Sequence, residues 1–228
     1  MPAEQPEEEM PEAVRKQVEL LQHSETDGRL CAARALGQIK HAAAVPSLIK
    51  ALKDQNEEVK KSAAIALGKI KDPRAVPYLG RMLLEAEPAV AMSARFGLVS
   101  IGHESAIPYA VAAIRYPDSI TRAEASDILA AFKHDQVIPP LIKALRNSEG
   151  FPRENVANEL LQISHKIQGK TVESKEAKTL QFVGQYFRKN EDPDIVRQAC
   201  LAALESKVTE KNARLFIKQL RAVKGHLK

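Results

Sequence analysis

A Val-Pro or Ile-Pro pair recurs every 31 residues, and this repeat constrains the fold more than any other feature of the sequence. The pairs begin at Val45, Val76, Ile107 and Ile138. Each opens a segment with apolar residues at helical spacing, such as VPSLIKAL from Val45. Because proline lacks a backbone N–H, it suits the first turn of a helix, where that group has no intrahelical partner. The four segments are therefore predicted to be copies of a first helix.

A second apolar ladder with the same period predicts a second helix in each repeat. Its leucines are Leu36, Leu67, Leu98, Leu129 and Leu160. Ala or Val stands four positions before each leucine and Ile or Phe three positions after it, which makes one apolar stripe. A single helix hairpin cannot cover such a stripe, whereas stacked hairpins share one continuous core. The predicted fold is all-α, a right-handed α-solenoid of stacked antiparallel helix pairs.

The register of the repeat also predicts how the chain is organised. Residues 1–11 carry four glutamates and no basic residue, so they are expected to be a disordered acidic tail. Residues 12–228 are predicted to form a single solenoid, with regular repeats at about 14–163, a polar insertion at about 164–178, and a final helix pair and closing helix at 179–228. Within the insertion, Gly169 is expected to stop one helix, and Thr171 is expected to cap a helix that runs to about residue 189.

Composition narrows the functional classes. An apolar fraction of 44% is enough for a core. The chain has no run of 18 apolar residues and no basic-then-apolar start, so neither a membrane span nor a secretory leader is expected, and the expected location is cytoplasmic. With Cys31 and Cys200 as the only cysteines, no disulfide framework or zinc site is predicted. The net charge of +5 permits an acidic protein or a nucleic acid as partner.

A consensus motif runs through the repeats: a polar or acidic turn, Val-Lys or Val-Arg, Ala-Leu-Gly-x-Ile, and Ala-Val-Pro-x-Leu. Its strongest copy runs from Asn56 to Leu83. This motif resembles HEAT repeats of the type named after phycobilisome lyases, over residues 27–163 well and over residues 178–205 less well. The resemblance implies stacked helix pairs and binding by a long curved surface. It leaves the function open, because such repeats serve as adaptors, chromophore-lyase subunits, iron–sulfur assembly factors and scaffolds for a few enzymes.

Two further series of equivalent positions are predicted to have structural roles rather than binding roles. A basic slot holds Arg29, Lys60, Arg122, Arg153 and Arg197, and another slot holds His41, His103, His134 and His165, with Asp72 in the same series. In HEAT-like repeats a base at the first slot usually bridges to a turn six residues earlier, as Lys60 would to Asp54, and this interpretation is preferred to a phosphate-binding ladder. The histidines follow the second helices, where the helix dipole and free carbonyls favour an imidazole without a metal. No metal or other cofactor is predicted.

The outward slots of the second helices are expected to line the concave face. The first three repeats present apolar Leu30, Ile65, Met92 and Phe96, framed by Arg34, Lys61 and Arg95, and the fourth presents Asp127. Aromatic, Met and Arg side chains are common interface anchors. These eight residues are therefore predicted to bind a peptide or helix with an apolar ridge and an acidic flank. The alternative is that Ile65 and Phe96 fill the seam between helices.

The predicted function is a non-catalytic scaffold or adaptor that binds a partner protein on the concave face. No phosphate loop, nucleophile elbow or nucleophile–histidine pair is present in the sequence, so the chain is not expected to be an enzyme. One alternative is nucleic-acid binding through the basic surface, which includes the stripe from Lys207 to Arg221. Another, implied by the resemblance alone, is an accessory subunit of a bilin lyase or of a cofactor-assembly system.

Overall fold

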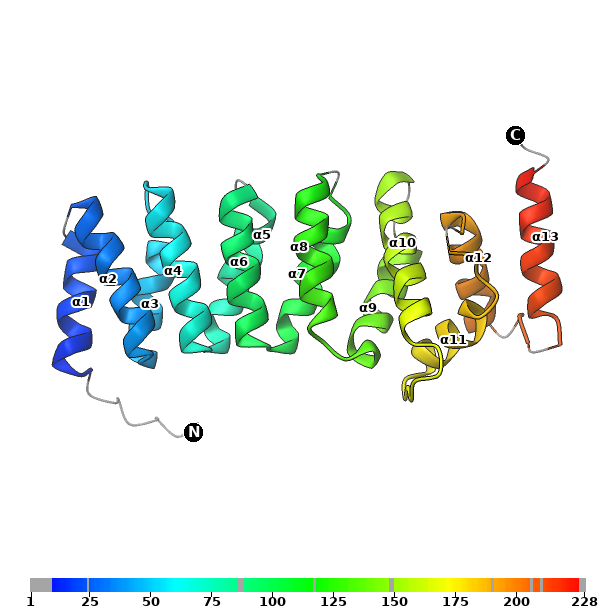
Figure 1. Cartoon of the computed structure of the whole chain (residues 1–228), viewed down its shortest axis with the longest axis horizontal. Coiled ribbons are helices and arrows are strands. Elements are labelled where there is room, and N and C mark those ends of the chain that lie inside the picture. The colour runs from blue at the N-terminus through cyan, green and yellow to red at the C-terminus, as the bar shows by residue number, and fades with distance from the viewer. Residues whose placement is uncertain are drawn as a thin grey trace. The chain divides into compact units, whose positions relative to one another are not determined.

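The computed structural model describes residues 10–23, 25–85, 88–116, 118–147, 150–189, 191–205, 207–209 and 211–225 of the chain. Those residues form thirteen α-helices and three short 3₁₀ turns, and they contain no strand (Figure 1). The predicted class, an α-solenoid of helix pairs, is confirmed. Nearly all of the predicted acidic tail, residues 1–9, lies outside the described residues.

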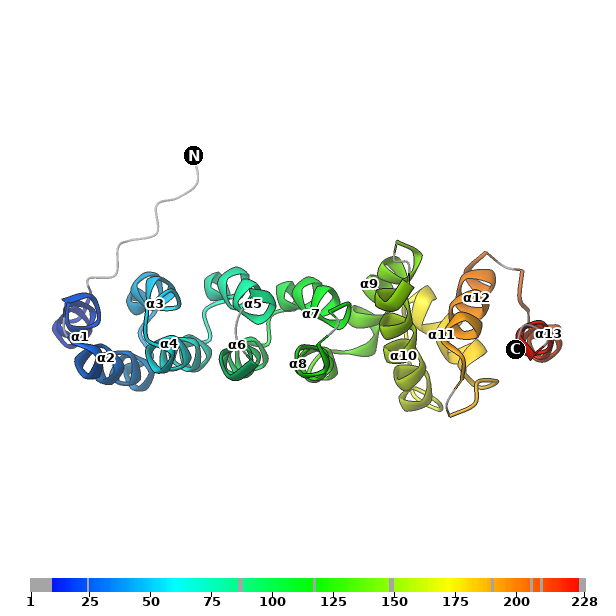
Figure 2. The ribbon, with the colours of Figure 1, turned by 90° about the horizontal axis from the view of Figure 1, so that it is seen from above.

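The chain divides into two compact units, residues 1–109 and 110–228, and the prediction of a single solenoid over residues 12–228 stays a prediction. The helices of the first unit are α1 (Glu12–His23), α2 (Thr26–Ile39), α3 (Val45–Ala51), α4 (Glu57–Ile70), α5 (Val76–Glu85) and α6 (Pro88–Ile101). Seen from above, α2, α4 and α6 form one layer and α1, α3 and α5 form the other (Figure 2). The unit is therefore a stack of three helix pairs.

The first helices begin where the Val-Pro and Ile-Pro pairs predict. Helices α3 and α5 start at the valine of the pair, and α7 (Ile107–Ile114), within which the two units divide, starts at the isoleucine. A 3₁₀ turn precedes each of them, and His41, Asp72 or His103 caps that turn. Each cap accepts a hydrogen bond from the backbone N–H two residues on, at 3.2, 2.9 and 3.3 Å respectively.

These caps correct the expected role of the histidine slot. Nδ1 of His41 and of His103 acts as an acceptor at the start of the next turn, rather than interacting with the end of the preceding helix. An imidazole that accepts through Nδ1 is neutral and carries its proton on Nε2. The carboxylate of Asp72 accepts the same hydrogen bond, which explains why aspartate substitutes for histidine in this series.

Two glycine-lined seams join the second helices of the first unit. A Cβ added to Gly37 of α2 would lie 2.9 Å from the Cα of Ala66 in α4, and one added to Gly68 would lie 2.8 Å from the Cα of Gly97 in α6. Because ordinary carbon contacts need about 3.5–4.0 Å, no larger residue fits at these points without moving a helix. The leucine ladder packs beside the seams, and Leu36, Leu67 and Leu98 are fully buried.

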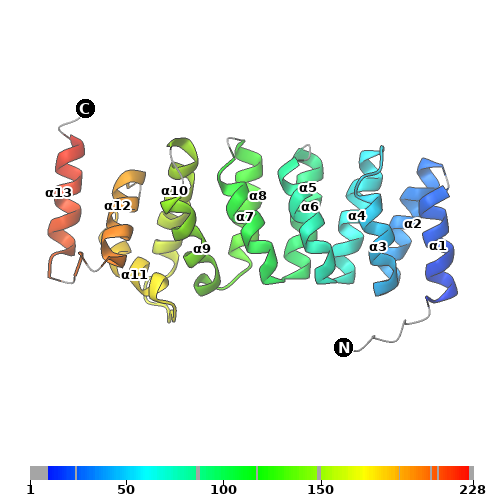
Figure 3. The ribbon, with the colours of Figure 1, turned by 180° about the vertical axis from the view of Figure 1, so that it is seen from behind.

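The second unit continues with the rest of α7 and six further helices. They are α8 (Ser119–Ala130), α9 (His134–Arg146), α10 (Gly150–Lys166), α11 (Lys175–Gly184), α12 (Pro193–Leu204) and α13 (Ala213–Gly225). Figure 3 shows α12 and α13 at the C-terminal end of this unit. Arg221 of α13 binds the buried carboxylate of Glu191, with Nε 3.2 and 3.3 Å from the two oxygens, and also donates to the carbonyl of Tyr186 at 2.8 Å.

Two boundaries in the second unit differ from the prediction. Helix α9 begins at His134 rather than at Ile138, because an α-helical turn replaces the 3₁₀ turn and the side chain of Gln136 accepts the N–H of Lys133 at 3.2 Å. Gly169 does follow α10 with φ of 74°. The cap of α11, however, is Ser174 rather than Thr171, and the helix ends at Gly184.

Asp135 explains the position of this cap. Its carboxylate accepts the backbone N–H groups of Glu173 and Ser174, at 3.0 and 2.8 Å, and so holds these residues outside the helix. The Ser174 hydroxyl then accepts the N–H of Ala177 at 3.1 Å. A contact between residues almost forty positions apart therefore sets the start of α11.

Candidate partner-binding surface

Seven of the eight predicted site residues lie on the layer of second helices in the first unit. They are Leu30 and Arg34 on α2, Lys61 and Ile65 on α4, and Met92, Arg95 and Phe96 on α6. We call these seven residues the Phe96 surface. Helix α4 contacts both α2 and α6. The eighth residue, Asp127, is an exposed residue of α8 in the second unit.

The apolar part of the Phe96 surface is open to solvent. Met92 is 52% exposed and Phe96 is 42% exposed, while Leu30 and Ile65 are half-buried. Met92 and Phe96 are four residues apart on one helix, so they project from the same face. The alternative that Phe96 fills the helix seam is wrong, because Phe96 is exposed and Gly68 packs against Gly97 in that seam. For Ile65, which is half-buried, the alternative is not decided.

Basic and acidic side chains lie on the same helices as these apolar groups. Lys61 Nζ lies 2.9 Å from Glu58 Oε1, within α4. This hydrogen bond and the charge of Lys61, with a smaller contribution from Arg34 on α2, hold the pKa of Glu58 below its usual range. With Arg95 and Lys69 also on this layer, four basic residues outnumber the three acidic ones, Asp27, Glu57 and Glu58. The layer therefore favours an acidic partner.

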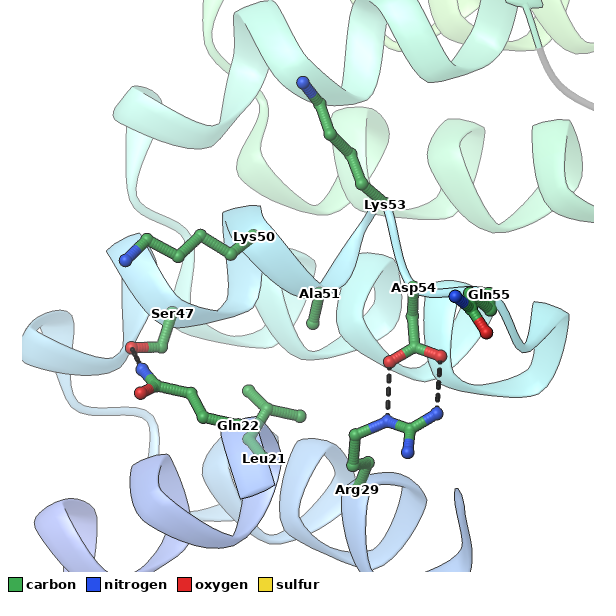
Figure 4. A pocket seen from close by; sticks show the side chains of 9 residues that line it. All are labelled: Leu21, Gln22, Arg29, Ser47, Lys50, Ala51, Lys53, Asp54 and Gln55. Carbon is green, nitrogen blue, oxygen red and sulfur yellow. Dashed lines mark hydrogen bonds and ion pairs between the residues drawn. The ribbon is translucent and has the colours of Figure 1, made fainter. Parts of the chain in front are cut away.

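A separate pocket of the first unit contains the ion pair of the basic slot. It has a volume of about 450 Å³ and lies between α1, α2, α3 and the turn before α4 (Figure 4). Arg29 Nε and Nη2 lie 2.7 and 2.9 Å from the two oxygens of Asp54. This Arg29 contact corrects the predicted pairing of Asp54 with Lys60, because the base comes from the preceding repeat. In Figure 4 the side chains of Lys50 and Lys53 point away from the ion pair, so the lysines do not converge on a ligand.

Two other members of the basic slot, Arg122 and Arg153, have different partners. Arg153 Nη2 of α10 lies 3.0 Å from Asp194 of α12. Arg122 donates to the carbonyl of Tyr116, in the turn six residues earlier, at 3.0 Å. These contacts join helices and turns of the stack, which is the structural role that the sequence predicts for this slot.

A polar cleft in the second unit is absent from the predicted site. It lies between α8 and α10, has a volume of about 350 Å³, and its polar lining is Arg122, Ser126, Asn155, Asn158, Glu159 and Gln162. Glu159 is only 6% exposed, and the Ser126 hydroxyl donates to its Oε2 at 2.9 Å. Burial raises the pKa of Glu159, although Ser126 and the charge of Lys166 oppose the shift.

The repeat itself carries the signal that would have identified Glu159. Counted in steps of 31 residues, the equivalent positions are Ala35, Ala66, Gly97 and Ile128. All four are apolar or glycine, and the last three are buried. A carboxylate in such a slot departs from the apolar pattern. Glu159 is therefore found when the core slots of the repeats are compared, and not from the outward slots alone.

The repeated helix pairs match a known protein family. The family profile described as HEAT repeats matches residues 14–99, 85–162 and 111–205. The chain belongs to the HEAT-repeat family. The resemblance seen in the sequence is thus confirmed over most of this HEAT-repeat protein, including the irregular part that follows residue 163.

Solved structures with low sequence identity resemble this HEAT-repeat protein. The complex of CpcE and CpcF of phycocyanin lyase from Nostoc sp. PCC7120 is 18% identical, with a TM-score of 0.49, over 96% of this chain and 97% of that chain. A designed armadillo repeat protein in complex with the peptide (KR)4 is 19% identical, with a TM-score of 0.46, over 85% and 99%. An archaeal HEAT-like repeats protein from Thermococcus onnurineus NA1 is 18% identical, with a TM-score of 0.43, over 90% and 87%. A search of curated proteins gave no match.

Within the part of the chain that the structure describes, no group of three or more His, Cys, Asp and Glu residues could hold a metal ion. In the same ranges, no helix is long and apolar enough to cross a membrane. Nδ1 of His41 and of His103 is engaged in capping, and burial together with Lys170 and Lys166 lowers the pKa of His134.

Proposed function

We propose that this protein is a non-catalytic scaffold that holds a partner protein on the Phe96 surface. The observation that carries the proposal is the exposure of Met92 and Phe96, at 52% and 42%. Both lie on a layer in which glycines let the neighbouring helices pack closely, so no seam is left for these side chains to fill. Fully burying a side chain of this size contributes roughly 1.5–3 kcal/mol. Covering the exposed half of each would therefore stabilise a complex by on the order of 1 kcal/mol per residue.

The surroundings of Phe96 suggest the chemistry of the partner. Arg34, Lys61 and Arg95 border the apolar residues, so an acidic flank on the partner would be attracted and a basic one repelled. Three parallel second helices present these side chains, which suits an amphipathic helix or extended peptide with an apolar ridge. On this proposal, the partner lies on the concave face of the stack.

The test compares two aromatic residues of equal exposure on opposite layers of the first unit. Phe96 on α6 is 42% exposed and Tyr78 on α5 is 41% exposed. Proteins that co-purify with the chain from its native host are identified for the wild type, Phe96→Asp and Tyr78→Asp, after circular dichroism confirms that both variants fold. We expect the partner to be retained by Tyr78→Asp and lost by Phe96→Asp.

Other outcomes of this experiment would overturn the proposal. A partner retained by Phe96→Asp would exclude the Phe96 surface as its binding site. Binding that disappears with nuclease or falls steeply with salt would favour nucleic acid instead. Bound pigment or metal in the purified protein would favour an accessory role in a lyase or a cofactor-assembly system.

A further inference from the structure

The polar cleft between α8 and α10 has an ordered arrangement of side chains along its length. At one end Arg122 and Asn155 both donate to the carbonyl of Tyr116, at 3.0 and 3.4 Å. Ser126 and Glu159 are each four residues further along their helices, about one helical turn or 5–6 Å away. Arg122 is thus held near the α7–α8 turn, and the carboxylate of Glu159 lies deeper in the cleft. Figures 1 and 2 show α8 and α10 as neighbours in the second-helix layer.

Glu159 is only partly satisfied within the protein. Ser126 donates to Oε2, whereas Oε1 has no hydrogen-bond partner among the described residues. Glu159 nevertheless lines the cleft while remaining only 6% exposed. A buried carboxylate without a full set of donors lowers the stability of a fold, and the other copies of the repeat fill this slot with Ala, Gly or Ile.

We propose that this cleft binds a basic side chain, arginine or lysine, of a partner polypeptide, whose cation pairs with Glu159. The pairing would supply the donors that Oε1 lacks and would neutralise the buried charge. This site lies in the second unit and does not depend on the Phe96 surface. Phe96→Asp is therefore expected to leave binding at the cleft unchanged.

The charges around the cleft favour a cation over an anion. Outside the lining of the cleft, Glu154 on α10 and Glu124 and Asp127 on α8 add negative charge to the two helices that form it. Arg122 is the basic residue that lines the cleft, and it donates to the Tyr116 carbonyl one turn from Glu159. Lys166 borders a smaller cavity of about 70 Å³ that Glu159 also lines, and it is not part of the polar cleft.

The amide groups favour a polypeptide as the source of the cation. Asn155, Asn158 and Gln162 line the cleft, and each amide side chain offers both donors and an acceptor, as the backbone of an extended peptide requires. The volume of about 350 Å³ is at the lower end of the range for ligand sites, about 300–1,000 Å³. The cleft therefore suits one long side chain and its adjoining backbone.

The test uses a fluorescein-labelled octapeptide of alternating glycine and arginine, measured by fluorescence anisotropy with the full chain. Glu159→Gln is expected to weaken binding at least about tenfold, because it removes one partner of a buried charge pair. Glu154→Gln is the matched control: it makes the same chemical change on the same helix but at an exposed position, and it should change binding less than about twofold. An octapeptide with citrulline in place of arginine, which is neutral, should not bind.

The stability of the variants distinguishes a functional role from a structural one. Glu159→Gln should melt at a higher temperature than the wild type at neutral pH, so weaker binding cannot be attributed to unfolding. Equal binding by Glu159→Gln and wild type, equal losses in the two glutamine variants, or binding of the citrulline peptide would overturn the proposal. If free agmatine binds as tightly as the peptide, the polypeptide source is wrong and the site is one for small cations.

Discussion

Substitution of Gly68 tests how closely α4 and α6 approach beneath the Phe96 surface. The added Cβ of Gly68→Ala would lie 2.8 Å from Gly97 Cα, against about 3.5–4.0 Å for an ordinary contact. The atom in the way belongs to the backbone, so the two helices must separate, by roughly 1 Å. Such overpacking costs about 1–3 kcal/mol, whereas alanine in place of glycine gains about 1 kcal/mol in a helix. The net effect is a loss of up to about 2 kcal/mol.

Thermal unfolding followed by circular dichroism measures this effect. For a chain of this size, we expect the melting temperature of Gly68→Ala to fall by up to about 8 °C. Gly68→Ser and Gly68→Val form a series of increasing volume and should be progressively less stable. A melting temperature that rises in Gly68→Ala, or that is the same across the series, would refute the close approach, because helix propensity alone would then determine the result.

Three further predictions concern the leucine ladder, the closing helix and the buried carboxylate. Leu98→Ala should destabilise the protein by about 2–5 kcal/mol in urea unfolding, since Leu98 is fully buried. Burial opposes ionisation of Glu191, but the hydrogen bond from Arg221 keeps the pKa of Glu191 below its ordinary value. The contact that holds α13 should therefore be lost in Arg221→Ala, and in the wild type as the pH falls through that lowered pKa. In both cases proteolysis should release α13. Burial raises the pKa of Glu159, so the stability advantage of Glu159→Gln should be largest at neutral pH and disappear as the wild-type carboxyl protonates in acid.

Local sequence patterns predict the helices and many of their ends. The starts of α3, α5 and α7 follow from Val-Pro and Ile-Pro pairs, whose effect on the backbone is local. The partner of Asp54 and the cap of α11 were predicted wrongly, because each depends on contacts between residues about 25 to 40 positions apart. A base from the preceding repeat binds Asp54, and Asp135 fixes the backbone before α11.

The candidate surface could be predicted only as well as the sequence shows which side of each second helix faces outward. A register of 31 residues places Arg34, Ile65 and Phe96 at equivalent positions, and the exposure of Phe96 confirms the outward phase on α6. The register does not reveal that Ile65 is half-covered, because that depends on neighbouring side chains. Glu159 lies outside the predicted surface because that prediction uses only the outward slots of the second helices, and Glu159 occupies a core slot.

A repeat protein offers an internal comparison that an ordinary domain lacks. Slots that face the core must satisfy the same packing in every copy, so Leu67, Leu98 and Leu129 are interchangeable in role and say little about function. A departure in such a slot costs stability unless something compensates for it. Glu159 departs in this way, and its carboxylate accepts from Ser126 across the two helices that form a cleft. Because the polar pair meets in a cavity open to a ligand rather than in a dry seam, its position is better explained by binding than by stacking.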